Sequence, residues 1–464
     1  MKITLHGAAG GEVTGSAYWV QTGKANILVD FGIFQGGKNA EAKNHRLSGL
    51  NSAALDAVIL THGHLDHTGR LPLLVKAGYA KPIYATSATC ELAALILRDA
   101  AHIQAQEAER ANRKRARAGL DPVEPLYTAD DVERTVLQLQ AIPYDQPLAV
   151  ADGISARVVE AGHMLGSVSV ELTVEEEGRK KVAVFSGDLG PKGLPILKDS
   201  TPLRYADAVF LESTYGDRDH RSLEATLHEA EEIIRQVAAR KRKLLIPAFA
   251  IGRSQQMLYH FATLFHSGKV PTFPVYLDSP MANAATRIYE HHPELWDEET
   301  QELVKQGVLR PNLPNIHLCE TAENSKKLND LPGPMAILAG SGMCHAGRIL
   351  HHLKNNLWKP ECVVMLVGFQ GAGTLGRMLV DGAKMVRIFG EEIAVRAEIH
   401  TLNGFSAHAG QTDLLRWFHS LSQSKPRTVL VHGENAQRTA LGELIHDRYH
   451  LDCDLPEQGD TISV

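Results

Sequence analysis

Short apolar runs that end in polar turns make up most of the first two hundred residues. Residues 27–30, 57–61, 168–172 and 182–185 are apolar or alternate between apolar and polar positions, and turn residues bound each of them. This pattern predicts β-strands whose ends lead into loops.

Two helical stretches interrupt these strands. Residues 88–120 carry a helical pattern, and an acidic helical stretch covers about 129–139. The first helix ends in basic residues, which are Arg110, Arg113, Lys114, Arg115 and Arg117. A solvated helix face is the favoured interpretation of this cluster, and a contact with phosphates is the alternative.

From about residue 208 the pattern changes to alternating strands and helices. Strand-like runs cover residues 208–211, 244–246, 275–277, 335–338 and 363–367, and a helix with one apolar stripe separates the first two. Such alternation predicts a mostly parallel sheet that is covered by helices.

After about residue 395 the chain returns to a strand–loop–helix–strand pattern, and no low-complexity linker separates the blocks. We therefore expect the middle block to be inserted into the first domain. The expected boundaries are 1–208 and 395–464 for the two parts of the first domain, and 209–394 for the inserted domain.

The composition is that of a globular protein. The chain has 464 residues, of which 44% are hydrophobic and 22% are charged. Its five cysteines are scattered and form no Cys-x-x-Cys pair, so neither a disulfide framework nor a thiolate zinc site is expected. No signal peptide and no apolar run of about twenty residues is recognised. These features predict a cytoplasmic protein without a membrane segment.

The formal net charge is −6, whereas a protein with a broad face for nucleic acid is usually positive. If the partner is a nucleic acid, its phosphates must be held locally, by metal ions, a few arginines and helix N-termini.

The most informative motif is Thr61-His62-Gly63-His64-Leu65-Asp66-His67, which directly follows an apolar run. Imidazole nitrogens and carboxylate oxygens are common ligands of Zn²⁺. In an extended stretch His62 and His64 point the same way, and Asp66 and His67 can then face a second ion. Two metal ions that clamp one hydroxide can hydrolyse a phosphodiester.

Three other segments place a candidate ligand near the end of a predicted strand. His163 precedes one strand, Asp188 follows another, and His432 follows Val429-Leu430-Val431. One such residue alone is more often part of a capped turn. Three of them, in a chain that already carries the histidine motif, indicate a metal site.

The chain resembles the metallo-β-lactamase superfamily, whose motifs match Asp30, the segment 62–67, His163 and Asp188. The resemblance covers nearly the whole chain. It implies an α/β fold, in which a metallo-β-lactamase αββα sandwich carries an inserted β-CASP domain with a mostly parallel sheet flanked by helices.

Three further residues resemble motifs A, B and C of the β-CASP branch of this superfamily. They are Glu212 in Leu211-Glu212-Ser213-Thr214, His408 in Ser406-Ala407-His408, and His432 before Gly433-Glu434. Within the branch, the chain is most similar to bacterial and archaeal relatives of the endonuclease that processes mRNA 3′ ends.

The resemblance implies two Zn²⁺ per chain. The first would be held by His62, His64 and His163, the second by Asp66, His67 and His432, and Asp188 would bridge them. Asp30 would fix a ligand histidine by accepting its other N–H. Two zinc ions, two carboxylates and a bridging hydroxide leave about one positive charge to face a phosphodiester.

The resemblance also implies the catalytic groups. Asp66 would orient the bridging hydroxide and take its proton. His408 would be the general acid that protonates the leaving sugar oxygen, and Glu212 would keep His408 protonated and aimed.

The middle block repeats one device, which is a strand followed by small residues and the start of a helix. Free N–H groups at a helix start attract phosphate, and ligands gather at the carboxyl ends of parallel strands. The residues predicted to bind phosphates are Arg253, Ser254, Ser279, Ser341, Gly342, Gln370, Thr374 and Arg377.

The favoured function is a zinc-dependent ribonuclease that cuts RNA internally in RNA processing or decay, with a homodimer as one assembly to test. A 5′-exoribonuclease of the ribonuclease J type stays open. It is disfavoured because the chain ends soon after His432 and has Ser406-Ala407-His408 where that type tends to have Ser-Gly-His.

Other members of the superfamily fit less well. DNA nucleases of the β-CASP branch usually have an apolar residue where His432 stands. Small-molecule hydrolases lack the inserted block, and an inactive scaffold would have lost ligands. Iron in place of zinc is disfavoured, because iron-binding members commonly carry acidic replacements in the first motif.

Overall fold

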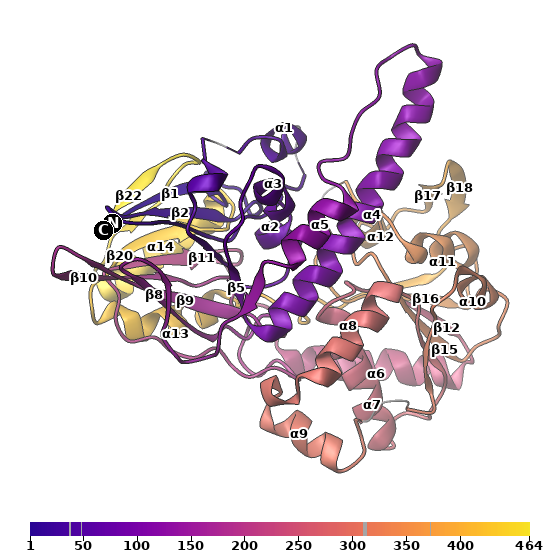
Figure 1. Ribbon diagram of the computed structural model, residues 1–464. Helices are drawn as coiled ribbons and strands as arrows, with labels where there is room; N and C mark the ends of the chain where they lie inside the picture. The colour runs from indigo at the N-terminus through magenta and orange to yellow at the C-terminus, as the bar shows by residue number, and fades with distance from the viewer. Residues whose placement is uncertain (37–38, 48, 310–312, 372) are drawn as a thin grey trace. The chain divides into compact units, whose positions relative to one another are not determined.

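The computed structural model describes residues 1–36, 39–47, 49–309, 313–371 and 373–464. They form two compact units, the first with residues 1–194, 198–219 and 408–464, and the second with residues 195–197 and 220–407. In Figure 1 the first unit contains both the indigo and the yellow end of the chain. It is therefore assembled from both ends of the polypeptide.

Two seven-stranded sheets form the centre of the first unit, with strand orders β22-β1-β2-β3-β4-β5-β6 and β21-β20-β11-β10-β9-β8-β7. The strands of the first sheet are β1 Lys2–Gly7, β2 Ala17–Gln21, β3 Asn26–Val29, β4 Ala57–Ile59, β5 Ile83–Ala85, β6 Leu139–Ala141 and β22 Thr461–Ser463. Those of the second are β7 Leu148–Ala151, β8 Ile154–Glu160, β9 Val168–Glu176, β10 Arg179–Phe185, β11 Ala208–Glu212, β20 Arg427–Val431 and β21 Cys453–Asp454.

The two sheets bury a common core and helices cover their outer faces. Ile27 and Ile59 of the first sheet pack with Val170 and Phe185 of the second. The helices are α1 Ala40–Asn44, α2 Leu65–Thr68, α3 Leu71–Lys76, α4 Ser87–Arg117, α5 Ala129–Val136, α13 Gln411–Ser422 and α14 Asn435–Tyr449. Side chains of α3, α4 and α5 cover the first sheet, and those of α13 and α14 cover the second. The predicted αββα sandwich is confirmed.

Strand β11 differs from the sequence-based grouping. The pattern places residues 208–211 with the alternating strands that follow, but β11 pairs in parallel with β10 and β20 in the second sheet of the first unit. A short, fully buried parallel strand has the same apolar pattern in either sheet. The pattern alone therefore did not assign this strand to its sheet.

The second unit is built on a six-stranded sheet of order β14-β13-β15-β12-β16-β19, in which every pair is parallel. Its strands are β12 Lys243–Pro247, β13 Val275–Leu277, β14 Ile316–Leu318, β15 Met335–Ala339, β16 Cys362–Leu366 and β19 Glu398–Thr401, beside a hairpin of β17 Met385–Ile388 and β18 Glu391–Ala394. Its helices are α6 Leu223–Ala239, α7 Arg253–His266, α8 Pro280–His291, α9 Glu298–Lys305, α10 Ala322–Lys327, α11 Arg348–Asn356 and α12 Leu375–Val380. Separate apolar clusters on both faces of the sheet confirm the predicted helix-covered parallel sheet.

Candidate metal centre

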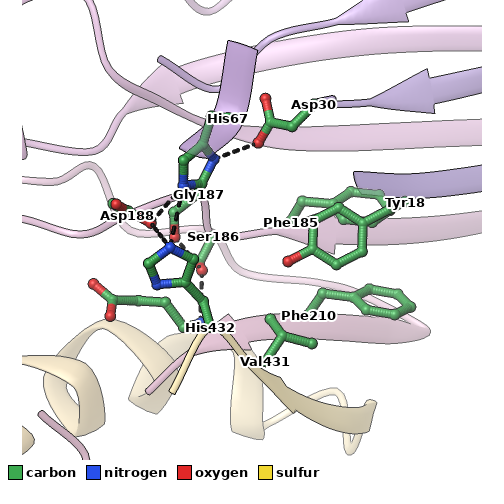
Figure 2. A pocket seen from close by; sticks show the side chains of 11 residues that line it. Tyr18, Asp30, His67, Phe185, Ser186, Gly187, Asp188, Phe210, Val431 and His432 are labelled. Atoms are coloured by element: carbon green, nitrogen blue, oxygen red, sulfur yellow. Dashed lines mark hydrogen bonds and ion pairs between the residues drawn. The ribbon is translucent and has the colours of Figure 1, made fainter. Parts of the chain in front are cut away.

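The turn after β4 carries the predicted ligands His62 and His64, and the short helix α2 that follows carries Asp66 and His67. Strand β3 pairs in parallel with β4, so Asp30 and Thr61 follow the same edge of the sheet. The Asp30 carboxylate accepts bonds from Thr61 N and Oγ1, both at 2.8 Å, and lies 2.7 Å from His67 Nδ1 (Figure 2). Asp30 thereby fixes the His67 ring with its Nε2 atom facing the site.

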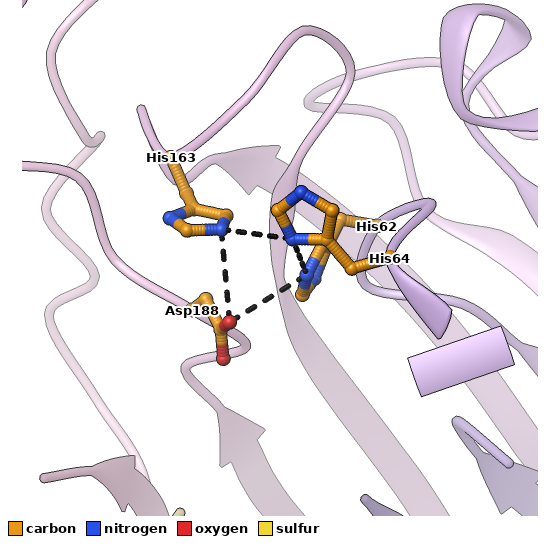
Figure 3. A group of neighbouring side chains, drawn as sticks. All are labelled: His62, His64, His163 and Asp188. Atoms are coloured by element: carbon orange, nitrogen blue, oxygen red, sulfur yellow. Dashed lines mark hydrogen bonds and ion pairs between the residues drawn. The ribbon is translucent and has the colours of Figure 1, made fainter. Parts of the chain in front are cut away.

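His62, His64, His163 and Asp188 form a first group, in which one nitrogen or oxygen atom of each converges (Figure 3). His64 Nδ1 lies 3.2 Å from both His62 Nε2 and His163 Nε2. Asp188 Oδ2 lies 3.5 Å from His62 Nε2 and 3.7 Å from His163 Nε2.

Asp66, His67, Asp188 and His432 form a second group. His67 Nε2 lies 3.3 Å from both His432 Nε2 and Asp188 Oδ1 (Figure 2). His432 Nε2 lies 3.5 Å from Asp66 Oδ2 and 3.6 Å from Asp188 Oδ1. Asp188 therefore faces the first group with one carboxylate oxygen and the second group with the other.

Both groups fit a small cation. Atoms that bind a cation tetrahedrally at 2.0–2.1 Å are about 3.3 Å from one another, and the separations quoted above lie between 3.2 and 3.7 Å. Buried Asp188 Oδ1 has no hydrogen-bond partner among the residues that the structure describes. A cation would satisfy this atom. The fold and these His/Asp clusters together indicate metal binding.

The protonation states of His62 and Asp188 suit metal ligands. Burial, followed by the nearby His67, holds the pKa of His62 well below its ordinary value, so its imidazole is neutral as a metal ligand must be. Burial alone would raise the pKa of Asp188. The surrounding imidazoles, chiefly His432 and His67, instead hold that pKa well below its usual range and keep the carboxylate ionised.

His408 stands beside the two groups and is paired with a carboxylate. Its Nδ1 atom lies 3.4 Å from Glu212 Oε1 and 4.0 Å from Asp188 Oδ2. Glu212 is itself anchored, since Oε1 accepts from Leu189 N at 2.9 Å and Oε2 from Thr214 N at 3.0 Å. Burial opposes the charged imidazole, but Glu212 outweighs it and raises the pKa of His408 to about 9. A protonated imidazole is thus aimed beside the metal ligands.

Comparison with known proteins accounts for this arrangement. Three family models match the chain: the metallo-beta-lactamase superfamily over residues 10–240, the Beta-Casp domain over 254–379, and the Zn-dependent metallo-hydrolase RNA specificity domain over 392–456. Over 445 residues, the chain is 42% identical to ribonuclease TTHA0252 of Thermus thermophilus, with 96% of each chain covered. The chain belongs to the β-CASP branch of the metallo-β-lactamase superfamily. The predicted resemblance and the predicted class, hydrolase, are confirmed.

More distant relatives share the β-CASP architecture. Transcription termination factor FttA of Pyrococcus abyssi is 30% identical, with 97% of this chain and 69% of FttA covered. FttA of Methanocaldococcus jannaschii is 28% identical over 100% of this chain and 72% of its own. A crystal structure of a protein of unknown function from Enterococcus faecalis shares the fold at 15% identity, with a TM-score of 0.54 over 100% of this chain and 99% of that one.

No helix within the described ranges of this β-CASP protein is long and apolar enough to cross a membrane.

The residues predicted to bind phosphates all lie in the second unit, in the loops and helix starts that follow its strands. Some of their side chains hold those loops in shape. Ser254 Oγ donates to Phe249 O at 2.7 Å, and Gln370 Nε2 donates to Gly342 O and Gly368 O, both at 3.0 Å. These bonds give Ser254 and Gln370 a role inside the β-CASP fold.

The other predicted phosphate-binding side chains are engaged in similar ways. Ser279 caps α8 and Thr374 caps α12, each by accepting a backbone N–H. Arg253 donates to Gln256, Arg377 pairs with Asp381, and Ser341 accepts from His345 N. Their contact with phosphate stays a prediction.

Two threonines contact predicted metal ligands, although the sequence motifs that contain them gave them no role. Thr61 Oγ1 lies 3.1 Å from His62 Nδ1 and 3.3 Å from His67 Nδ1, and Thr214 Oγ1 lies 3.2 Å from His432 Nδ1. Both hydroxyls therefore contact the rear nitrogen of a predicted ligand. The sequence did hold a signal for this role, since each threonine lies within two positions of a predicted ligand or carboxylate at the end of a strand.

Proposed function

We propose that this protein is a zinc-dependent ribonuclease that binds two Zn²⁺ per chain and cuts RNA phosphodiester bonds internally. The observation that carries the proposal is Asp188, whose two carboxylate oxygens face two separate ligand groups. RNA is the favoured substrate because the relative at 42% identity is named a ribonuclease and an RNA specificity domain model matches residues 392–456.

The donor atoms favour zinc. Both groups consist of imidazole nitrogens and carboxylate oxygens that lie within 4.8 Å of one another, and this mixture of donor atoms suits Zn²⁺ better than an all-oxygen site would. When bound, two Zn²⁺ would acidify a water molecule and place positive charge beside the scissile phosphate.

The chain's own groups then act on either side of the phosphorus atom. The Asp66 side chain is 22% exposed, whereas that of Asp188 is 2% exposed. Asp66 can therefore reach the attacking water, orient it and take its proton. His408 donates a proton to the leaving sugar oxygen, and Glu212 holds the donor in position.

The proposal is tested with purified, zinc-loaded protein and end-labelled RNA and DNA of equal sequence. Internal cuts in RNA alone are the expected result. Stepwise release of nucleotides from the 5′ end would favour the ribonuclease J-type alternative. Degradation of DNA at a comparable rate would overturn the RNA assignment.

Replacing His432 by alanine is expected to lower the zinc content from two ions per chain to one. The second group loses an imidazole that contacts both Asp66 and Asp188, whereas all residues of the first group remain. Elemental analysis of the purified variant measures the change, and His446→Ala on the exposed side of α14 is the matched control. Two zinc ions in the His432 variant would contradict the assignment of the second group.

Four further features belong to the same proposal. The loops that carry Arg253, Ser279, Ser341 and Arg377 are proposed to contact the phosphates of the substrate. Domain boundaries after residues 208 and 394, a cytoplasmic location and a homodimer stay predictions.

A further inference from the structure

Helix α4 extends far beyond the part of the first unit that it packs against. Its buried residues all lie between Ala88 and Ala101, and from His102 onward its residues are exposed or half-buried. In Figure 1 this second half and the chain that returns from it extend beyond the other helices and strands of the first unit. Residues 102–126 are called the α4 arm below. Most helices in proteins are stabilised by packing against a core, and the arm buries no residue in one. Its presence therefore calls for another explanation.

The returning chain covers one side of the arm. Asn112 Nδ2 donates to Val123 O at 2.9 Å, and Asn112 Oδ1 accepts from Val123 N at 2.7 Å. Arg115 Nε donates to Asp121 O at 2.5 Å. Asn112 and Arg115 are three positions apart, so they share the side of the helix that faces the returning chain.

Four cations occupy the opposite side of the arm, and we call them the basic face. Arg110, Arg113, Lys114 and Arg117 follow the spacing i, i+3, i+4, i+7, which places them on one side of a helix. All four are exposed. Arg113 pairs with exposed Glu109 at 3.3 Å, a contact of little energy in water. No acidic residue lies between positions 110 and 117.

We propose that the basic face is a second contact for the RNA backbone, outside the metal centre. The inference rests on the proposed ribonuclease function. A row of exposed cations fits the regular charges of a phosphate backbone, and arginine can hold a phosphate with two hydrogen bonds. The basic face is positively charged although the whole chain has a net charge of −6. The face would therefore attract a negatively charged polymer locally.

The same helix also contacts the metal centre. A Cβ atom on Gly63, between His62 and His64, would lie 3.2 Å from Leu92 Cβ. The hydroxyls of Thr86 and Thr89 donate to Gly166 O at 2.7 and 2.8 Å, in the loop that carries His163. The helix therefore links the ligand loops directly to the basic face.

The distance along α4 between the metal centre and the basic face determines how long an RNA must be to reach both. From Leu92 to Arg113 the helix rises about 32 Å, at about 1.5 Å per residue. A stacked strand that advances about 3.4 Å along its axis per nucleotide needs about nine nucleotides to cover that distance. The basic face should therefore matter for long substrates and not for short ones.

The test compares wild type with a variant in which Arg110, Arg113, Lys114 and Arg117 are all changed to glutamine. One RNA has flanks of about four nucleotides on each side of the cut, and the other has flanks of about twenty. On the long RNA, kcat/KM is expected to fall about tenfold or more at low salt, and its logarithmic salt slope to become less steep by up to about three. On the short RNA, kcat/KM should stay unchanged.

The matched control removes four dispersed cations of the first unit, with Lys24, Lys76, Lys81 and Arg448 changed to glutamine. An equal loss in this control, or an equal loss on short and long RNA, would overturn the proposal. So would a change in sedimentation that shows the basic face holding a second copy of the chain. If the wild type cuts no RNA, the proposed function fails, and fluorescence anisotropy with the long RNA still decides whether the basic face binds phosphates.

Discussion

Replacing Asp188 by alanine is expected to remove metal from both groups and to lower RNA cleavage by at least about 1,000-fold. One carboxylate serves both groups, with Oδ2 facing the first and Oδ1 facing the second. Its loss leaves three imidazoles in one group and two imidazoles with Asp66 in the other. The first set then has no negative charge to offset a buried dication, and the second set keeps only that of Asp66.

Zinc content by elemental analysis and kcat/KM on RNA measure this outcome. Asp152→Ala, at the exposed turn between β7 and β8, is the matched control and should keep both ions and full activity. A variant without Asp188 that retains two ions per chain would show that the carboxylate does not join the two groups.

Replacing His408 by alanine is expected to lower kcat by about 100- to 10,000-fold while zinc content and KM change little. The ring contacts Glu212 and lies beside Asp188, but it belongs to neither ligand group. Its loss therefore removes a proton donor without removing a ligand. Elemental analysis and steady-state kinetics on one RNA separate the two effects.

A Glu212→Gln variant tests the same pair from the other side. The amide keeps the size of the side chain but loses the negative charge, so the His408 imidazolium is less stabilised and kcat should fall less than in the alanine variant. Normal turnover after loss of His408 would remove this histidine from the mechanism, and loss of zinc would instead make it a ligand.

The strand ends explain why much of the metal centre was visible in the sequence. Asp30 and the 62–67 motif follow apolar runs, and neighbouring parallel strands end at the same edge of a sheet, as β3 and β4 do. The grouping of the ligands came from the resemblance, and the distances bring the same residues together. The sharing of Asp188 between groups depends on the positions of two carboxylate oxygens, which no spacing in the sequence specifies.

Other features could not be predicted from the sequence, because they depend on which backbone groups a side chain contacts in the fold. Ser254 and Gln370 were chosen for their place in small-residue loops, yet both bond to carbonyl groups of those loops. The role of Thr61 was not predicted, because its hydroxyl donates to Asp30, which follows the neighbouring strand. The sequence pattern predicted that the basic residues of α4 lie on a helix. It did not predict that they face away from the returning chain, because that depends on the bond between Asn112 and Val123 O.

The ends of the polypeptide meet in the first sheet, where β22 pairs with β1, and the ring of His67 meets that of His432 across 365 positions. A ribosome releases the amino-terminal ligands long before the carboxyl-terminal one. While it is being translated, the nascent chain therefore cannot complete the second ligand group. The proposed cutting activity is therefore expected only after His432 has been synthesised and folded against His67.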